Sequence, residues 1–169
     1  VNLSLGTQWN SDQVPSWSTL EDEFAQLKAD GIFTVVAAGN AFADYGVPGL
    51  SYPAASPDVV PAASVDNDGS LSYFSQRSPR VLAAPGRSIT STVPDHVFGA
   101  DGILNDFGTA SGTSMAAPYV AGAGVLLRQA MEQLGYKNIT QDTLYNHLYA
   151  TADVIHDAAT GLHYHRIDV

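Results

Sequence analysis

The sequence predicts an α/β protein in which a mostly parallel sheet is flanked by helices, and three observations support this class. A strand-like segment at residues 1–6 is followed by a helical pattern and then by the apolar segment IFTVVAAGN at residues 32–40. That second segment is continuous and rich in β-branched residues, which is typical of a strand covered on both faces. Strand and helix patterns then continue to alternate along the chain. The strand–helix–strand order indicates a parallel pair with a right-handed crossover.

The first helix is expected within residues 16–31, where apolar side chains recur at helical spacing. These apolar residues are Leu20, Phe24 and Leu27. Ser18 or Thr19 is expected to cap the helix, because a hydroxyl can accept a hydrogen bond from a free N–H of the first turn. Gly31 is expected to end it.

Further short strands are expected at residues 58–65, 70–75, 80–86 and 88–92. The DNDG turn at residues 66–69 is expected to join the first two of these as a hairpin. Its aspartates, Asp66 and Asp68, would also suit calcium, but the turn lacks the other ligands of a calcium loop, so a plain turn is favoured.

Two helices are expected in the last third of the chain. The longest covers residues 114–135, and its small-residue face should pack tightly in the core; the last is amphipathic and covers residues 140–152. Thr140 is expected to cap the last helix, which explains the NIT triplet at Asn138 more simply than glycosylation does. His163 and His165 would share one face of a strand, as a metal site needs, but a solvated tail is favoured.

Composition excludes several classes of function. The net charge is −10, with 17 acidic and 7 basic residues and no basic cluster, so a nucleic-acid partner is not expected. The sequence has no cysteine, which excludes disulfides and zinc–thiolate sites. No apolar run is long enough for a membrane span, and no signal-peptide pattern is present. Because the chain opens inside a strand without a starting methionine, we expect a fragment or a processed product.

Ligand sites in parallel sheets lie beyond the carboxyl ends of the strands, where residues 4–6 and 37–40 are expected. Ser114 lies at the start of the longest helix, whose free N–H groups favour an anion. Pro118 has no N–H, so the carbonyl of Ser114 loses its helical partner. The backbone N–H of Ser114 and the side-chain amide of Asn40 are candidate donors to an oxyanion. Taken singly, a serine here is most often a cap and an asparagine after glycine most often a turn residue.

Longer motifs around these two residues resemble those of one family. GTSMAAPYVAG at residues 112–122 resembles the nucleophile motif of the subtilisin-like serine proteases, and VVAAGN at residues 35–40 resembles their oxyanion-hole segment. Shorter matches are SYPAASPDVV at 51–60, SYFS at 72–75 and VLAAPG at 81–86. The resemblance extends from residues 1–6 to residues 151–161, in the family's order. It implies a three-layer α/β architecture, with residues 1–169 forming the C-terminal portion of one peptidase domain whose N-terminal part is missing.

The resemblance assigns roles to individual residues of a serine endopeptidase. Ser114 matches the nucleophile, and Asn40 matches the oxyanion donor. Three residues match the strand that pairs with an extended polypeptide substrate: Ser4, Leu5 and Gly6. Five residues match the primary specificity pocket: Ala37, Ala38 and Gly39 on one wall, and Ser51 and Tyr52 on the other. Their small size suggests room for a sizeable apolar side chain, and the Tyr52–Pro53 peptide bond is expected to be cis.

The remaining members of a catalytic triad are expected upstream of this chain. The family's Asp-Thr/Ser-Gly and His-Gly-Thr motifs are both absent, and none of the five histidines has a matching context. The chain alone is therefore expected to be inactive. It is also expected either to pair with the upstream part of the same domain or to self-associate through an exposed sheet edge. The family implies a secreted or cell-surface protein that requires no cofactor, with calcium left open as a structural ion.

The sequence departs from the family's pattern at two places, and two other functions stay open as alternatives. Tyr119 stands where the family usually has histidine, which should cause only local repacking. Residues 94–111 are longer than in compact members and are expected to form a loop near the cleft that affects selectivity. The alternatives are a non-catalytic homologue that binds peptides or partners, and a sedolisin-type serine-carboxyl peptidase. The sedolisin type places an aspartate in the oxyanion hole, so Asn40 argues against it.

Overall fold

The computed structural model describes residues 1–97, 100–103 and 105–168, and a six-stranded sheet lies at its centre. The strand order is β1 (Asn2–Leu3), β3 (Val35–Ala37), β5 (Val60–Val65), β6 (Leu82–Pro85), β10 (Leu162–Arg166) and β9 (Asp153–Asp157). The first five strands run parallel, and β9 pairs antiparallel with β10. The predicted α/β class with a mostly parallel sheet is confirmed.

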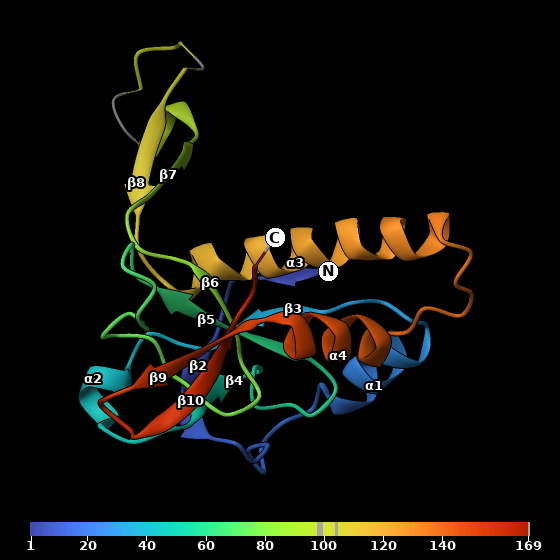
Figure 1. Cartoon of the computed structure of the whole chain (residues 1–169). Coiled ribbons are helices and arrows are strands. Elements are labelled where there is room, and N and C mark those ends of the chain that lie inside the picture. Colours follow the sequence, from blue (N-terminus) through green and yellow to red (C-terminus); the bar gives the residue numbers. More distant parts are fainter. Residues whose placement is uncertain (98–99, 104, 169) are drawn as a thin grey trace.

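Helices cover both faces of this sheet and make three layers (Figure 1). α3 (Thr113–Gln133) packs on β3, β5 and β6, and α4 (Gln141–Thr151) packs beside it. Alternate residues of each strand face these two helices, and the others face α1 (Glu21–Ala29). Strand residues are therefore buried on both faces, which explains why β3 is a continuous apolar run and why every residue of β5 is buried.

Two small two-stranded sheets and two short helices complete the fold. β2 (Thr7–Ser11) pairs antiparallel with β4 (Leu50–Tyr52), and β7 (Ile89–Thr92) pairs antiparallel with β8 (Phe107–Ala110). The β7–β8 hairpin extends away from the body of the molecule (Figure 1). The predicted loop at residues 94–111 thus contains β8 and the 3-10 helix Asp95–Val97, with residues 98, 99 and 104 outside the described part. The α2 helix (Phe42–Tyr45) follows β3. Neither α2 nor the strands β2, β4, β8 and β9 were predicted from the sequence.

Of the two predicted helix caps, one is confirmed and one is wrong. Thr140 accepts a hydrogen bond at Oγ1 from the N–H of Thr143 at 3.1 Å. The N-cap position of α1 is held by Leu20, and neither Ser18 nor Thr19 caps the helix. The hydroxyl of Ser18 is engaged with the Glu21 carboxylate at 3.0 Å and the Tyr52 hydroxyl at 2.6 Å. A tertiary contact has therefore taken the group that a local cap would use.

The DNDG segment forms the predicted turn, but residues 70–75 do not form a strand. The pairing ends after one antiparallel bridge, between Val65 and Leu71. Both turn carboxylates are occupied within the turn, because Asp68 accepts hydrogen bonds from Ser70 N–H and Oγ, and Asp66 accepts one from Ser72 Oγ. Within the described residues no group of three or more His, Cys, Asp or Glu side chains is placed to hold a metal ion.

The expectation of a solvated tail around His163 and His165 is wrong. Both belong to β10, which pairs with β6 and covers what would otherwise be a sheet edge. The residue between them, Tyr164, is 0% exposed, so strand alternation fixes this segment to the core. His165 stacks on Tyr149 with ring centroids 3.6 Å apart.

Within the described residues no helix is long and apolar enough to cross a bilayer.

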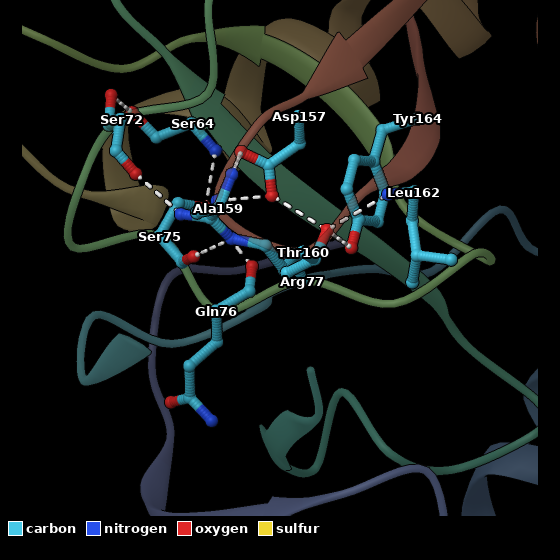
Figure 2. Close-up of polar contacts among 10 residues, drawn as sticks. All are labelled: Ser64, Ser72, Ser75, Gln76, Arg77, Asp157, Ala159, Thr160, Leu162 and Tyr164. Atoms are coloured by element: carbon cyan, nitrogen blue, oxygen red, sulfur yellow. Dashed lines mark hydrogen bonds and ion pairs between the residues drawn. The ribbon is translucent and has the colours of Figure 1, made fainter. Parts of the chain in front are cut away.

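A buried arginine ties the C-terminal hairpin to the segment between β5 and β6 (Figure 2). Arg77 is 1% exposed, and its guanidinium donates to the Asp157 carboxylate at 2.8 Å and to the carbonyls of Ser75 and Ser72 at 2.9 and 3.0 Å. The guanidinium also lies over the Phe42 ring, 3.6 Å from its centroid. These contacts hold residues 72–77 in one conformation against β9 and β10.

Replacing Asp157 should show how much this ion pair contributes. Asp157→Ala leaves the buried guanidinium without its carboxylate, so we expect the free energy of unfolding to fall by about 3 kcal/mol. Denaturant unfolding at neutral pH measures this. Asp153→Ala is the matched control, since it removes the partly exposed pair with Arg166 and should change stability by less than about 1 kcal/mol. Similar losses in the two variants would contradict the prediction.

The same pair should also make stability depend on pH. Burial alone raises the pKa of the Asp157 carboxyl, but hydrogen bonds from Arg77 and Thr160 and the charge of Arg77 outweigh it, so the pKa lies below its ordinary value. Such a carboxylate stabilises the fold above its unfolded-state pKa, and this contribution disappears as the pH falls through the folded-state pKa. The unmodified chain should therefore lose stability below about pH 4, and Asp157→Ala should lose less over that range.

Candidate active site

The start of α3 brings Ser114 to the surface beside the end of β3. Gly112 precedes the helix in an extended conformation and donates its N–H to the Gly86 carbonyl at 2.8 Å. A Cβ on Gly112 would lie 3.2 Å from Nδ2 of Asn40, so a side chain here would crowd the Asn40 amide. Because residue 112 has no side chain, Ser114 and Asn40 can face the same cavity.

The Ser114 carbonyl has no helical partner because Pro118 lacks an N–H, and it accepts a hydrogen bond from Ser4, which follows β1. Ser4 Oγ donates to the Ser114 carbonyl at 2.7 Å, and Ser114 Oγ donates to the Ser4 carbonyl at 3.3 Å. Two hydrogen bonds thus connect segments that are 110 residues apart. They place the predicted substrate-pairing segment directly beside the predicted nucleophile.

The side-chain amide of Asn40 has a defined orientation because Thr113 holds its oxygen. Oδ1 of Asn40 accepts from the Thr113 N–H at 2.9 Å and from the Thr113 hydroxyl at 3.0 Å. Thr113 Oγ1 in turn accepts from the Gly39 N–H at 3.1 Å. A backbone N–H can only donate, so it must face the amide oxygen, and Nδ2 of Asn40 is left as the outward donor.

A cavity of about 310 Å³ opens between these segments, and it collects most of the predicted site residues. Those that line it are Leu5, Gly6, Ala37, Gly39, Asn40, Ser51 and Ser114. Ser4 is exposed beside the cavity and contacts Ser114. Ala38 and Tyr52 are buried behind it, in the core on the α1 side of the sheet. The Tyr52–Pro53 peptide bond is cis, as predicted.

Sequence patterns missed several lining residues, namely Thr7, Gln8, Ala41, Gln76 and Thr113. Thr113 stands inside the motif that marked Ser114, so its neighbourhood was visible in the sequence although its role was not. Gln76 comes from the irregular segment between β5 and β6, which carries no helix or strand periodicity.

The surroundings of Ser114 hold donors but no base. No titratable side chain lines the cavity described above. A second cavity, of about 400 Å³, borders Ser114 on its other side and is lined mainly by β7 and the first turns of α3. Within the described residues, none of the five histidines lines either cavity. Among the described residues, the two cavities therefore bring hydrogen-bond donors to Ser114 but no histidine.

An α/β fold with a serine at a helix start and a fixed amide opposite it is the kind of site that serine hydrolases use. Comparison with known proteins identifies the family. The chain matches the Subtilase family, peptidase S8, over residues 1–166. The chain therefore belongs to the subtilase family of serine proteases.

Individual relatives support the assignment. The chain is 32% identical over 150 residues to the major intracellular serine protease of Bacillus subtilis, covering 88% of this chain and 42% of the relative. It is 31% identical over 160 residues to subtilisin DY of Bacillus licheniformis, covering 94% and 51%. It thus spans about half the length of these relatives or less.

Solved structures show the same fold. The prenylagaramide maturation protease PagA superposes with a TM-score of 0.77 at 24% identity, covering 99% of this chain and 58% of that one. The self-cleaved protease domain of PatA superposes with a TM-score of 0.73 at 26% identity, covering 90% and 53%.

Gly39 is required at the cavity wall both by its backbone and by its surroundings. Its φ is +109°, and an added Cβ would lie 2.0 Å from Gln76 Oε1 and 2.8 Å from Ser51 Cβ. We expect Gly39→Ala to lower the free energy of unfolding by about 2–4 kcal/mol. Gly161→Ala is the control, because φ is +70° there but nothing lies within 4 Å, and it should cost about 1 kcal/mol. Equal costs would mean that the close contacts at Gly39 are unimportant.

Proposed function

We propose that Ser114 is the nucleophile of a serine endopeptidase and that Asn40 stabilises the oxyanion. The observation that carries the proposal is the orientation of Asn40, whose Oδ1 is held by Thr113, the residue immediately before Ser114. The same contact positions the donor Nδ2 and the start of the helix that carries the nucleophile. Such fixed donors stabilise charge that develops in the transition state without reorganising.

The chemistry follows from these positions. Ser114 Oγ attacks the carbonyl carbon of the scissile peptide, its proton passes to a base, and the carbonyl oxygen becomes an oxyanion. Asn40 Nδ2 and the Ser114 N–H donate to this oxygen; within the described residues that N–H has no acceptor of its own. The tetrahedral intermediate collapses to an acyl-enzyme as the amine leaves with the proton. Water then attacks the acyl group by the same steps and releases Ser114.

The extended substrate would pair with residues 4–6. This segment lies outside the strands and is exposed, so its backbone groups can join a substrate strand. Gly6 brings the backbone close to the opposite wall, because a Cβ there would lie 2.6 Å from Ser51 Oγ. A polypeptide that pairs here would direct one side chain into the cavity beside Ser114.

The base and its orienting acid are proposed to come from an upstream part of the same domain, of which residues 1–169 form the C-terminal portion. In the described part of the sheet, β1 pairs on one side with β3 and its other side is open. Beside it, α3 exposes Val125 and Leu126 by 67% and 63%, and a cavity of about 440 Å³ is lined by residues of β1, the β3 approach and α3. An upstream strand and helix would cover this surface. In their absence we expect self-association there.

Three further expectations stay predictions. A non-catalytic peptide-binding homologue would keep this geometry without a base, and the labelling experiment below separates it from an enzyme. Secretion is implied by resemblance to subtilisins, while one relative is named as an intracellular protease. A structural calcium ion is the third expectation, and no site for it is assigned.

A fluorophosphonate probe tests the proposal directly, because it reacts with a serine only when a base activates it. We expect labelling at Ser114 when this chain is present with the upstream part of its domain, and none for residues 1–169 alone. Ser114→Ala in the complete domain is the control for site-specificity. A folded complete domain that is not labelled would exclude the endopeptidase and support the binding homologue.

Thr113 should matter to rate more than to substrate binding. Thr113→Val removes the hydroxyl that donates to Asn40 and accepts from Gly39, so the Asn40 amide is less firmly held. We expect kcat of the complete enzyme to fall about tenfold with a smaller change in KM, since oxyanion contacts form in the transition state. Thr113→Ser keeps the hydroxyl and should retain most of the activity. An increase in KM alone would argue against this positioning role.

A further inference from the structure

The cavity beside Ser114 contains a buried polar side chain that the reaction described above does not use. Gln76 is 2% exposed and lines the cavity together with Gly39 and Ser51. Buried amides normally have partners for both their nitrogen and their oxygen. The nitrogen and the oxygen of the Gln76 amide have different surroundings.

The nitrogen of Gln76 is fully engaged by β2. Nε2 donates to the Trp9 carbonyl at 2.8 Å and to Asn10 Oδ1 at 2.8 Å. A backbone carbonyl can only accept, so the nitrogen must face β2 and the oxygen must face away from it. Asn10 is itself oriented by a carbonyl, because its Nδ2 donates to Val47 at 3.2 Å. The direction of the Gln76 amide is thus set by backbone groups.

The oxygen of Gln76 lies at the cavity wall. Oε1 is 2.0 Å from the position that a Cβ on Gly39 would take, and Gly39 lines the cavity. Among the described residues, no donor bonds to Oε1. Ser51 also lines the cavity, and its hydroxyl donates to the Ala37 carbonyl at 3.4 Å, which leaves its oxygen free to accept. Gln76 and Ser51 thus offer acceptor oxygens, and no charged side chain lines the cavity.

Gln76 is held rigidly enough to select ligands. Its N–H donates to the Gly39 carbonyl at 2.8 Å, and the next residue, Arg77, is anchored to Asp157. In Figure 2 the side chain of Gln76 points away from the hydrogen-bonded cluster around Arg77. A side chain fixed at its backbone and at its nitrogen cannot turn its oxygen away from an unsuitable ligand.

We propose that Gln76 selects substrates whose residue before the scissile bond ends in a neutral hydrogen-bond donor, with glutamine preferred. This inference rests on the proposed function, because it takes the cavity as the primary specificity pocket. A methionine side chain of similar size would leave Oε1 buried and unpaired. A glutamate would place its carboxylate against the fixed Gln76 oxygen, and a lysine would bring a charge into a cavity lined by no opposite charge. The small lining residues alone suggested an apolar preference, and Gln76 changes that expectation.

Peptide binding tests this without requiring catalysis. The protein is the complete domain carrying Ser114→Ala, and the ligands are acetyl-tripeptidyl acids of alanine extended by glutamine, methionine or glutamate, measured by calorimetry. We expect the glutamine peptide to bind about tenfold more tightly than the methionine peptide, and the glutamate peptide to bind most weakly. A glutamine-to-methionine ratio near one, or no measurable binding of any peptide, would overturn the proposal.

Two variants show whether Gln76 is responsible. Gln76→Met removes the acceptor at similar volume and should bring the ratio close to one. Gln26→Met changes an exposed glutamine on α1, outside this cavity, and should retain the preference. If Gln76→Met fails to fold, Gln76→Ala serves instead, and it should likewise bring the ratio close to one. An unchanged ratio in a folded Gln76 variant would refute the assignment, whereas failed fluorophosphonate labelling would refute only the proposed catalysis.

Discussion

The hydrogen bonds of Thr113 are the constraint on which the site depends. This buried residue joins the end of β3 to the start of α3 through Gly39 and Asn40. Without that connection, a serine at a helix start and an asparagine after a strand would be two unrelated surface residues. With it, the orientation of an amide and the position of a hydroxyl follow from a single contact. The geometry of the site is thus a property of how one helix docks on one strand.

The docking of α3 depends in turn on small side chains. Alanines and a valine of α3 pack on alternate residues of β3, β5 and β6. Gly124 lets the helix approach Phe33 so closely that a Cβ would lie 2.4 Å from the ring. Larger residues would lift the helix from the sheet and separate Thr113 from Asn40. Core packing and the geometry of the candidate site are therefore set by the same surface.

The segment between β5 and β6 illustrates how a side chain can be placed by contacts that sequence does not reveal. Arg77 reaches across to Asp157, 80 residues later, and is buried with its charge paired. Because that ion pair fixes the local backbone, the neighbouring Gln76 enters the cavity with its amide held by β2. Neither residue follows a helical or strand pattern. Their positions result from long-range partners.

The sequence by itself determined the α/β class, the major helices, the buried strands and the positions of Ser114 and Asn40, because periodicity and motif spacing are local properties. The tertiary structure decided the roles of Thr113 and Gln76, the place of β10 in the sheet and the burial of Ala38 and Tyr52 behind the cavity. It also decided that Ser18 binds Glu21 and Tyr52 and leaves α1 without a side-chain cap. In each of these cases a partner distant in sequence competes with, or supplies, the hydrogen bond or burial on which the outcome depends.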